Sequence, residues 1–309
     1  MTALYYKTKN FNLKIKKVAL LTLFISMLFI SADIRRYAND GLSLCFNVII
    51  GSVFPFMIAT DLILPFLYKS DFEILKNLFK NLFKINGAAL NAFICAILCG
   101  FPLGARLGDE LYAKGILTRN EFERFIGISS VASPAFVISG IGAAMRGNLL
   151  EGILLYFSSV ISTVIIGVLF SVRSSPSHDS SAEAPPTTDF TNSVKRAVVA
   201  TINICGFVTV FSVLCGILDS LTIPSVLKYA VLPFLEISNA SKTLSESSLN
   251  PSTSLSLTAF AITFSGFSAH MQVKSFITSR EISMKKYYLM KLSSGALSAS
   301  LLFIYGKLK

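Results

Sequence analysis

Long apolar runs, broken by glycine and proline at corresponding places in the two halves, most constrain what this chain can fold into. The first half carries FPF at 54–56, GFPLGAR at 100–106 and SP at 133–134, and the second carries LPF at 232–234, GFSAHMQ at 266–272 and SSG at 293–295. Backbone that leaves helical geometry at bilayer depth survives only where it is buried in protein or lines a cavity. A weak repeat of this kind is typical of small-solute transporters.

The composition indicates an all-α polytopic membrane protein. Hydrophobic residues make up 53% of the chain, and the mean hydropathy is +0.65. The net charge of +11 comes from Lys and Arg near the ends of apolar runs, where they face anionic lipid and set topology. We therefore expect membrane lipid, and no nucleic acid, as a partner.

No motif points to an enzyme, a cofactor or a metal. The five cysteines all lie within apolar runs, where packing thiols are expected, and no histidine is close to them in sequence. The chain has no HExxH, no phosphate loop and no nucleophile motif.

Four segments follow along the chain. Residues 1–40 combine a basic N-terminus with an uncleaved first transmembrane helix at 18–32, and we expect the N-terminus to be cytoplasmic. Residues 41–172 and 194–309 are the two repeats. Residues 173–193 are rich in Ser, Pro and charge and predict a disordered linker.

Within the repeats, we expect a mixture of complete and interrupted spans. The span at 42–68 is kinked or divided at Pro55, residues 71–84 form an interfacial helix, and the stretch that begins at residue 85 breaks near Pro102. Further interruptions are expected at Ser133-Pro134, around Pro233 and within residues 255–278. Other predicted spans cover residues 149–172, 194–218 and 287–305.

Aligning the halves suggests which residues correspond. Matching Pro55 to Pro233 places Asp61 opposite Asn239. Matching Gly100 to Gly266 places Arg106 opposite Gln272. The repeats are inverted if an odd number of spans separates them. Chance similarity between apolar segments is the alternative.

Three segments resemble a known family. CGFPLGARLGDEL at 99–111, SVASPAFVISGIG at 130–142 and FSGFSAHMQVKSF at 264–276 are similar to the YlbJ family of sporulation integral membrane proteins, within the nucleoside-recognition (Gate) domain family. The resemblance implies a fold related to concentrative nucleoside transporters. It also implies transport of dipicolinic acid across the outer forespore membrane.

The candidate substrate site combines the breaks with polar residues beside them. Arg106 suits a substrate carboxylate, and the alternative is that it snorkels or pairs with Asp109 or Glu110. Ser133 and Pro134 would start a half-helix whose amide groups face an anion, unless they only form a kink. The remaining candidates expose backbone at the breaks or follow the second break: Gly100, Pro102, Gly104, Gly266, His270 and Gln272. For His270, a packed interhelical position is the alternative.

The candidate ion-coupling residues are Asp61, Glu236 and Asn239, in or beside proline-interrupted spans. Intramembrane carboxylates commonly bind a coupling proton or sodium ion. Hydrogen bonds that hold two helices together are the alternative.

The sequence thus predicts a permease for a small anionic metabolite, with dipicolinate suggested by the resemblance. One alternative is a non-transporting scaffold for spore cortex or envelope assembly, and another is a nucleoside transporter. A homo-oligomer or sporulation membrane proteins are conceivable partners.

Overall fold

The computed structural model describes residues 17, 21, 31–69, 72–175, 189–278 and 282–308, and every element in these ranges is a helix. Four of the described helices are long and apolar enough to cross a membrane, or five if one bent pair is counted as a span. Large apolar side chains such as Phe157, Ile161, Ile202 and Val210 are exposed on two of them. The protein is therefore an integral membrane protein. Most of the predicted first helix and residues 176–188 of the linker lie outside the described residues.

The first span is one continuous helical run. It consists of α2 (Ser31–Leu44), the π-helix η1 (Cys45–Ile50) and α3 (Gly51–Lys69). Pro55 and Pro65 lie inside α3, so the prediction of a span divided at Pro55 is wrong. The wider π-helical turn just before Pro55 gives a physical reason, because such turns help a helix to continue past a missing donor.

The rest of the first half alternates short and long helices. The amphipathic α4 (Glu73–Phe83) is followed by a 108° bend into η2 (Gly87–Ala89) and α5 (Leu90–Cys99). The chain then breaks before α6 (Leu103–Ala113), as the sequence predicted. A second break separates α7 (Arg119–Ser129) from the π-helix η3 (Ala135–Met145), and α8 (Leu149–Ser171) completes the half.

The second half has the same order without a counterpart of α4. The long α9 (Phe190–Ser220) begins inside the predicted linker, because the Asp189 carboxylate accepts the Asn192 backbone N–H at 2.7 Å and caps the helix. A break at Glu236 divides α10 (Ser225–Leu235) from α11 (Ile237–Ser245). Another at Ser265 divides α12 (Pro251–Phe264) from α13 (Gly266–Ser275), and α14 (Lys285–Leu308) closes the chain.

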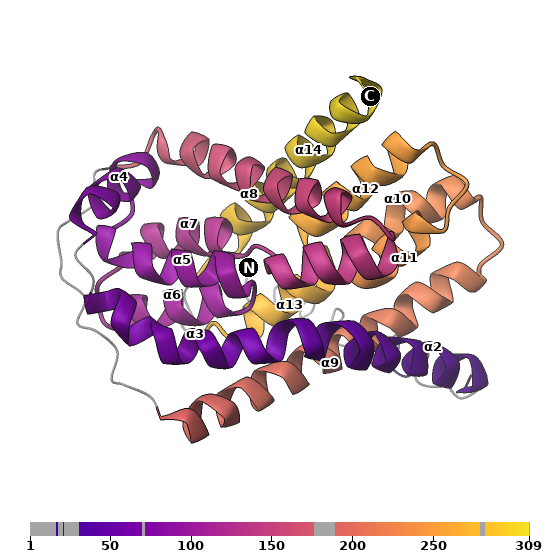
Figure 1. The fold of residues 1–309 in the computed structure, drawn as a ribbon, viewed down its shortest axis with the longest axis horizontal. Coiled ribbons are helices and arrows are strands. Elements are labelled where there is room, and N and C mark those ends of the chain that lie inside the picture. The colour runs from indigo at the N-terminus through magenta and orange to yellow at the C-terminus, as the bar shows by residue number, and fades with distance from the viewer. Residues whose placement is uncertain are drawn as a thin grey trace, which may run out of the picture.

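The two longest helical runs lie side by side along one edge of the protein (Figure 1). They are antiparallel, because a Cβ on Gly216 would meet Tyr37 and one on Gly41 would meet Ser212. The far end of the same pair is joined by an ion pair between Asp61 of α3 and Arg196 of α9. This pair forms a common wall for the cavities described below.

One end of the protein, which we call the basic end, gathers α4, the α6–α7 turn and the starts of α9 and α14. Lys286 of α14 donates to Asn120 at 3.0 Å, and the Asn86 backbone N–H donates to Glu121 at 2.9 Å. Basic side chains are frequent here: Lys76, Lys80, Lys84, Lys114, Arg119, Lys195, Arg196, Lys285 and Lys286.

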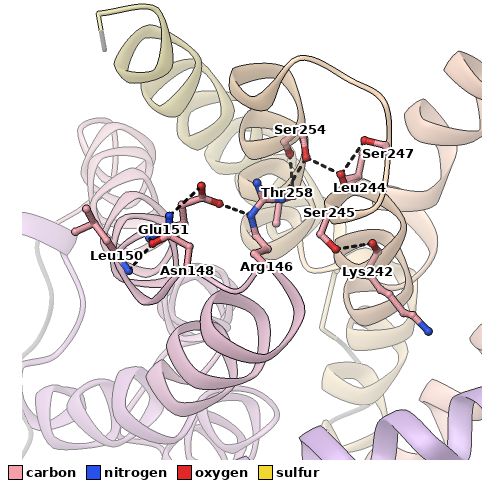
Figure 2. Close-up of polar contacts among 10 residues, drawn as sticks. All are labelled: Arg146, Asn148, Leu150, Glu151, Lys242, Leu244, Ser245, Ser247, Ser254 and Thr258. Atoms are coloured by element: carbon pink, nitrogen blue, oxygen red, sulfur yellow. Dashed lines mark hydrogen bonds and ion pairs between the residues drawn. The ribbon is translucent and has the colours of Figure 1, made fainter.

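At the opposite end, Arg146 links the two halves (Figure 2). Its Nε donates to Glu151 at 2.6 Å, and its Nη1 donates to Ser254 at 3.2 Å and Thr258 at 3.3 Å. Ser254 in turn donates to the Leu244 carbonyl at 2.6 Å. The ends of η3 and α11 are therefore both fastened to the start of α12.

Candidate functional site

The four interruptions of the helices meet around one cavity in the interior, which we call the central cavity. It is narrow in this structure, with a volume of about 30 Å³. Phe101, Ser133, Glu236 and Ser265 each bring one break to its wall. The two long helical runs close the remaining side with apolar residues: Ile49, Val53, Ile204 and Val208.

In the first half, the two breaks lie directly against each other. Gly100 has φ +78°, and a Cβ there would stand 2.5 Å from the backbone nitrogen of Ser133. The Phe101 N–H donates to the Val131 carbonyl at 2.8 Å, just before the cis bond to Pro102. Only glycine suits this position, because it tolerates the positive φ and leaves room for the neighbouring backbone.

Gly104 extends this contact by one helical turn. A Cβ on it would stand 2.6 Å from the carbonyl oxygen of Ser129 in α7. Its role in the structure is thus close packing of α6 against α7.

The breaks of the second half also touch. Gly266 has φ +59°, and a Cβ on it would stand 3.0 Å from the Leu235 carbonyl oxygen and 3.1 Å from the Glu236 nitrogen. Ser265, just before it, has φ +81°. Each half therefore joins its own two interruptions into one unit.

The second piece of each interrupted pair begins at the central cavity. These pieces are α6, η3, α11 and α13, and their first turns have backbone N–H groups without intrahelical partners. Ser133 Oγ accepts the Phe136 N–H at 3.2 Å, with Pro134 between them, which is the arrangement expected of a Ser-Pro helix start. Helix starts of this kind favour an anionic or acceptor group of a ligand.

The two largest polar side chains in the wall of this cavity are Glu236 and Gln272, and four serines also line it: Ser133, Ser238, Ser265 and Ser268. Glu236, which is 3% exposed, caps α11 by accepting the Asn239 N–H at 2.7 Å. Gln272 Nε2 faces Ser268 Oγ at 3.4 Å, and its buried Oε1 has no hydrogen-bond partner in the structure. Because leaving such an atom unpaired costs about 1–3 kcal/mol, Gln272 is suited to accept a hydrogen bond from a ligand.

Arg106 lies beside the central cavity rather than in its wall. Its Nη2 donates to Asp61 Oδ1 at 2.7 Å, and Arg196 Nε donates to Asp61 Oδ2 at 2.8 Å. Glu110 is 3.9 Å from Arg106, while Asp109 instead accepts from the backbone and side chain of Thr278. The carboxylate that holds Arg106 therefore comes mainly from α3, which the sequence did not predict.

The structure places His270 away from the central cavity. The ring is fully buried, and its Nδ1 lies 2.7 Å from the hydroxyl of Tyr287. Phe264 meets it edge to face at 4.7 Å between centroids, and Tyr288 does so at 5.3 Å. These contacts are those of a histidine packed between helices, which was the alternative to substrate binding by His270.

Asn239 faces a separate cavity at the end opposite the basic end. Its Nδ2 donates to Ser212 at 2.8 Å and to Glu236 at 2.9 Å, so it ties α11 to α9. We call this cavity the acidic vestibule, since its wall contains three acidic residues and one lysine: Asp40, Asp219, Glu246 and Lys242. Asp61 and Asn239 thus lie on opposite sides of the central cavity.

Two residues of interest escaped the sequence reasoning. Lys291 is 1% exposed, and its Nζ donates to the Ser130 carbonyl at 2.6 Å, at the break between α7 and η3. A lysine inside the apolar run at 287–305 was an available signal, because intramembrane charges are rare. Arg196 gave no such signal, because a basic residue at the start of a span usually sets topology.

Comparison with known proteins gives one relative. The chain is 21% identical to the sporulation integral membrane protein YlbJ of Bacillus subtilis (strain 168) over 347 aligned residues, which cover 96% of this chain and 85% of the relative. No family profile matches the chain, and no solved structure matches it. The distant but full-length match confirms the resemblance to the YlbJ family that the sequence motifs indicated.

Proposed function

We propose that this chain, a distant full-length relative of a sporulation integral membrane protein, is a permease for a small anionic metabolite, with dipicolinate as the first substrate to test. The observation that carries the proposal is the meeting of the four breaks around the central cavity. Interrupted helices are tolerated at bilayer depth only around such a space, and transporters bind their substrates there. The absence of an enzyme motif leaves transport as the function that best fits this architecture.

The order and direction of the elements support the inverted repeat that this proposal includes. In the first half, α5 and α6 form a hairpin that enters and leaves at the basic end, where Asn86 donates to the Ile116 carbonyl at 3.4 Å. In the second half, α10 and α11 form a hairpin at the opposite end. Each hairpin is followed by a broken crossing helix and then by a long helix. This order supports a fold related to concentrative nucleoside transporters.

The same order changes which residues correspond. It pairs the break at Gly100 with the break at Glu236, and the break at Ser133 with the one at Ser265. The sequence alignment matched Gly100 to Gly266 because the residues around them are similar. In this repeat, however, Gly100 lies in a hairpin, whereas Gly266 lies in a broken crossing helix. Pro55, matched to Pro233 in sequence, lies inside a continuous helix instead.

The distribution of charge supports an orientation and a mechanism. Basic residues face the cytoplasm in most membrane proteins, so we place the basic end there. Because α2 starts at the opposite end, a crossing helix before it would put the N-terminus in the cytoplasm. Movement of one repeat against the other would then expose the central cavity to each side in turn, with the outer forespore membrane as the site of action.

One observation favours a second candidate, a nucleoside. The described residues that line the central cavity include the carboxylate of Glu236 and the amide of Gln272, but no lysine or arginine. Such a wall suits hydroxyl and ring-nitrogen groups as well as it suits a carboxylate held by helix starts. The cations that would attract an anion lie in the neighbouring cavity, with Arg106.

Uptake by the full-length protein in liposomes tests both candidates. We expect labelled dipicolinate to accumulate, labelled uridine to be excluded, and Gln272→Leu to reduce uptake strongly. Met271→Leu is the matched control, because this neighbour on α13 does not line the central cavity. Uptake of uridine instead of dipicolinate would show that the substrate is a nucleoside and not an anion. Uptake of neither solute by correctly inserted protein would favour the scaffold alternative.

A further inference from the structure

A second cavity of about 380 Å³ lies next to the central cavity on the side of the basic end, and we call it the basic vestibule. Its wall includes three cationic side chains: Arg106, Lys195 and Arg196. Met57 lines the vestibule one helical turn after Val53 of the central cavity, and Ala200 does so one turn before Ile204. The two cavities therefore follow one another along α3 and α9.

Arg106 and Arg196 hold the Asp61 carboxylate in the way that they could hold the carboxylate of a ligand. Each of its oxygens accepts a hydrogen bond from a different guanidinium group, at 2.7 Å from Arg106 and at 2.8 Å from Arg196. The Asp61 side chain is only 7% exposed, whereas those of Arg106 and Arg196 are 24% and 44% exposed. Guanidinium groups are suited to recognise carboxylates, and these two are accessible enough to change partner.

The balance of charge favours an anion. Among the charges that the structure describes here, Lys195 and the two arginines are positive, and Asp61 and, at 3.9 Å from Arg106, the more exposed Glu110 are negative. If Asp61 left its partners, the positive surplus would rise by one. The negative charge of an incoming carboxylate would compensate this added positive charge in place of Asp61.

We propose that Asp61 is an internal substitute for a ligand carboxylate, which a small carboxylate anion displaces from Arg106 and Arg196 on its way to the central cavity. This inference rests on the proposed transport function and adds its entry site and its selectivity. Asp61, once displaced, is a buried carboxylate without its partners, so the cost of displacing it opposes binding of the anion.

Equilibrium binding of labelled dipicolinate and labelled succinate to the full-length protein in lipid nanodiscs tests this inference. Asp61→Asn removes the competing charge, so we expect binding about tenfold or more tighter. Arg196→Gln should weaken binding about tenfold.

Glu123→Gln is the matched control, because Glu123 is also buried at the basic end and contacts two cations, Arg119 and Lys286, each at 3.2 Å. We expect it to leave binding unchanged. Weaker or unchanged binding by Asp61→Asn, or wild-type affinity in Arg196→Gln, would overturn the inference. If Asp61→Asn does not fold, Arg196→Gln still decides. The liposome uptake assay judges transport separately, so binding with the expected changes but without flux would reject only the transport function.

Discussion

Replacing Gly100 with alanine tests whether the two breaks of the first half form one unit. The backbone there has φ +78° and ψ −178°, a region that is almost exclusive to glycine and costs other residues about 1–3 kcal/mol. The new Cβ would also stand 2.5 Å from the Ser133 backbone nitrogen. A change of rotamer cannot relieve a clash with backbone, and overpacking of this kind adds about 1–3 kcal/mol. We therefore expect a total destabilisation of about 2–6 kcal/mol.

Gly115→Ala separates the two contributions. Gly115 also has a positive φ, +72°, but a Cβ there would have nothing within 4 Å. This control should cost only about 1–2 kcal/mol. Unfolding of the purified full-length variants by increasing mole fractions of dodecyl sulfate measures the difference, and liposome uptake shows its consequence. Equal unfolding midpoints and equal uptake for the two variants would refute the close contact between the breaks.

Two further contacts give predictions that are checked by the same unfolding assay. Gly216→Ala in α9 should lower stability by about 1–3 kcal/mol, because its Cβ would clash with the Tyr37 ring. Gly206→Ala, on the same helix with nothing within 4 Å, should be neutral or stabilising, and equal losses in both would disprove the tight α2–α9 contact. Arg146→Met should cost about 2 kcal/mol, because the Arg146 side chain is only 8% exposed and Glu151 loses its charged donor. Adding Glu151→Gln should restore part of this loss, and a purely additive double variant would contradict the pairing.

The sequence predicted most of the interruptions because glycine and proline act locally. The breaks at Gly100–Pro102 and after Ser130, and the uninterrupted α8 and α14, appear where the pattern placed them. Pro55 misled the prediction, since proline in a membrane helix can be accommodated by a neighbouring wide turn. The break at Glu236 lies three residues after Pro233 and coincides with the carboxylate that caps α11.

The candidate site was less predictable because it depends on contacts between distant segments. Arg106 and Asp61 are 45 residues apart, and no local pattern indicates that they pair. His270 was selected because it is a polar residue after a break, but the aromatic residues that enclose it come from α12, α13 and the start of α14. Gln272, two residues further along α13, does reach the central cavity. His270 and Gln272 point from different faces of α13, and the sequence could not show which face meets the cavity because the start of α13 was not known.

The hydrogen bond from Lys291 to the Ser130 carbonyl has a consequence for biosynthesis. That carbonyl belongs to the first half, yet its donor is on α14, which is synthesised after all the other described helices. Ser298 of the same helix also bonds Ser158 of α8, at 3.0 Å. A nascent chain that stops before α14 lacks the donor that this carbonyl of its N-terminal half accepts from, so that half matures only after α14 has been synthesised. Truncated chains should therefore be recognised and degraded by membrane quality control even if every earlier helix has been inserted.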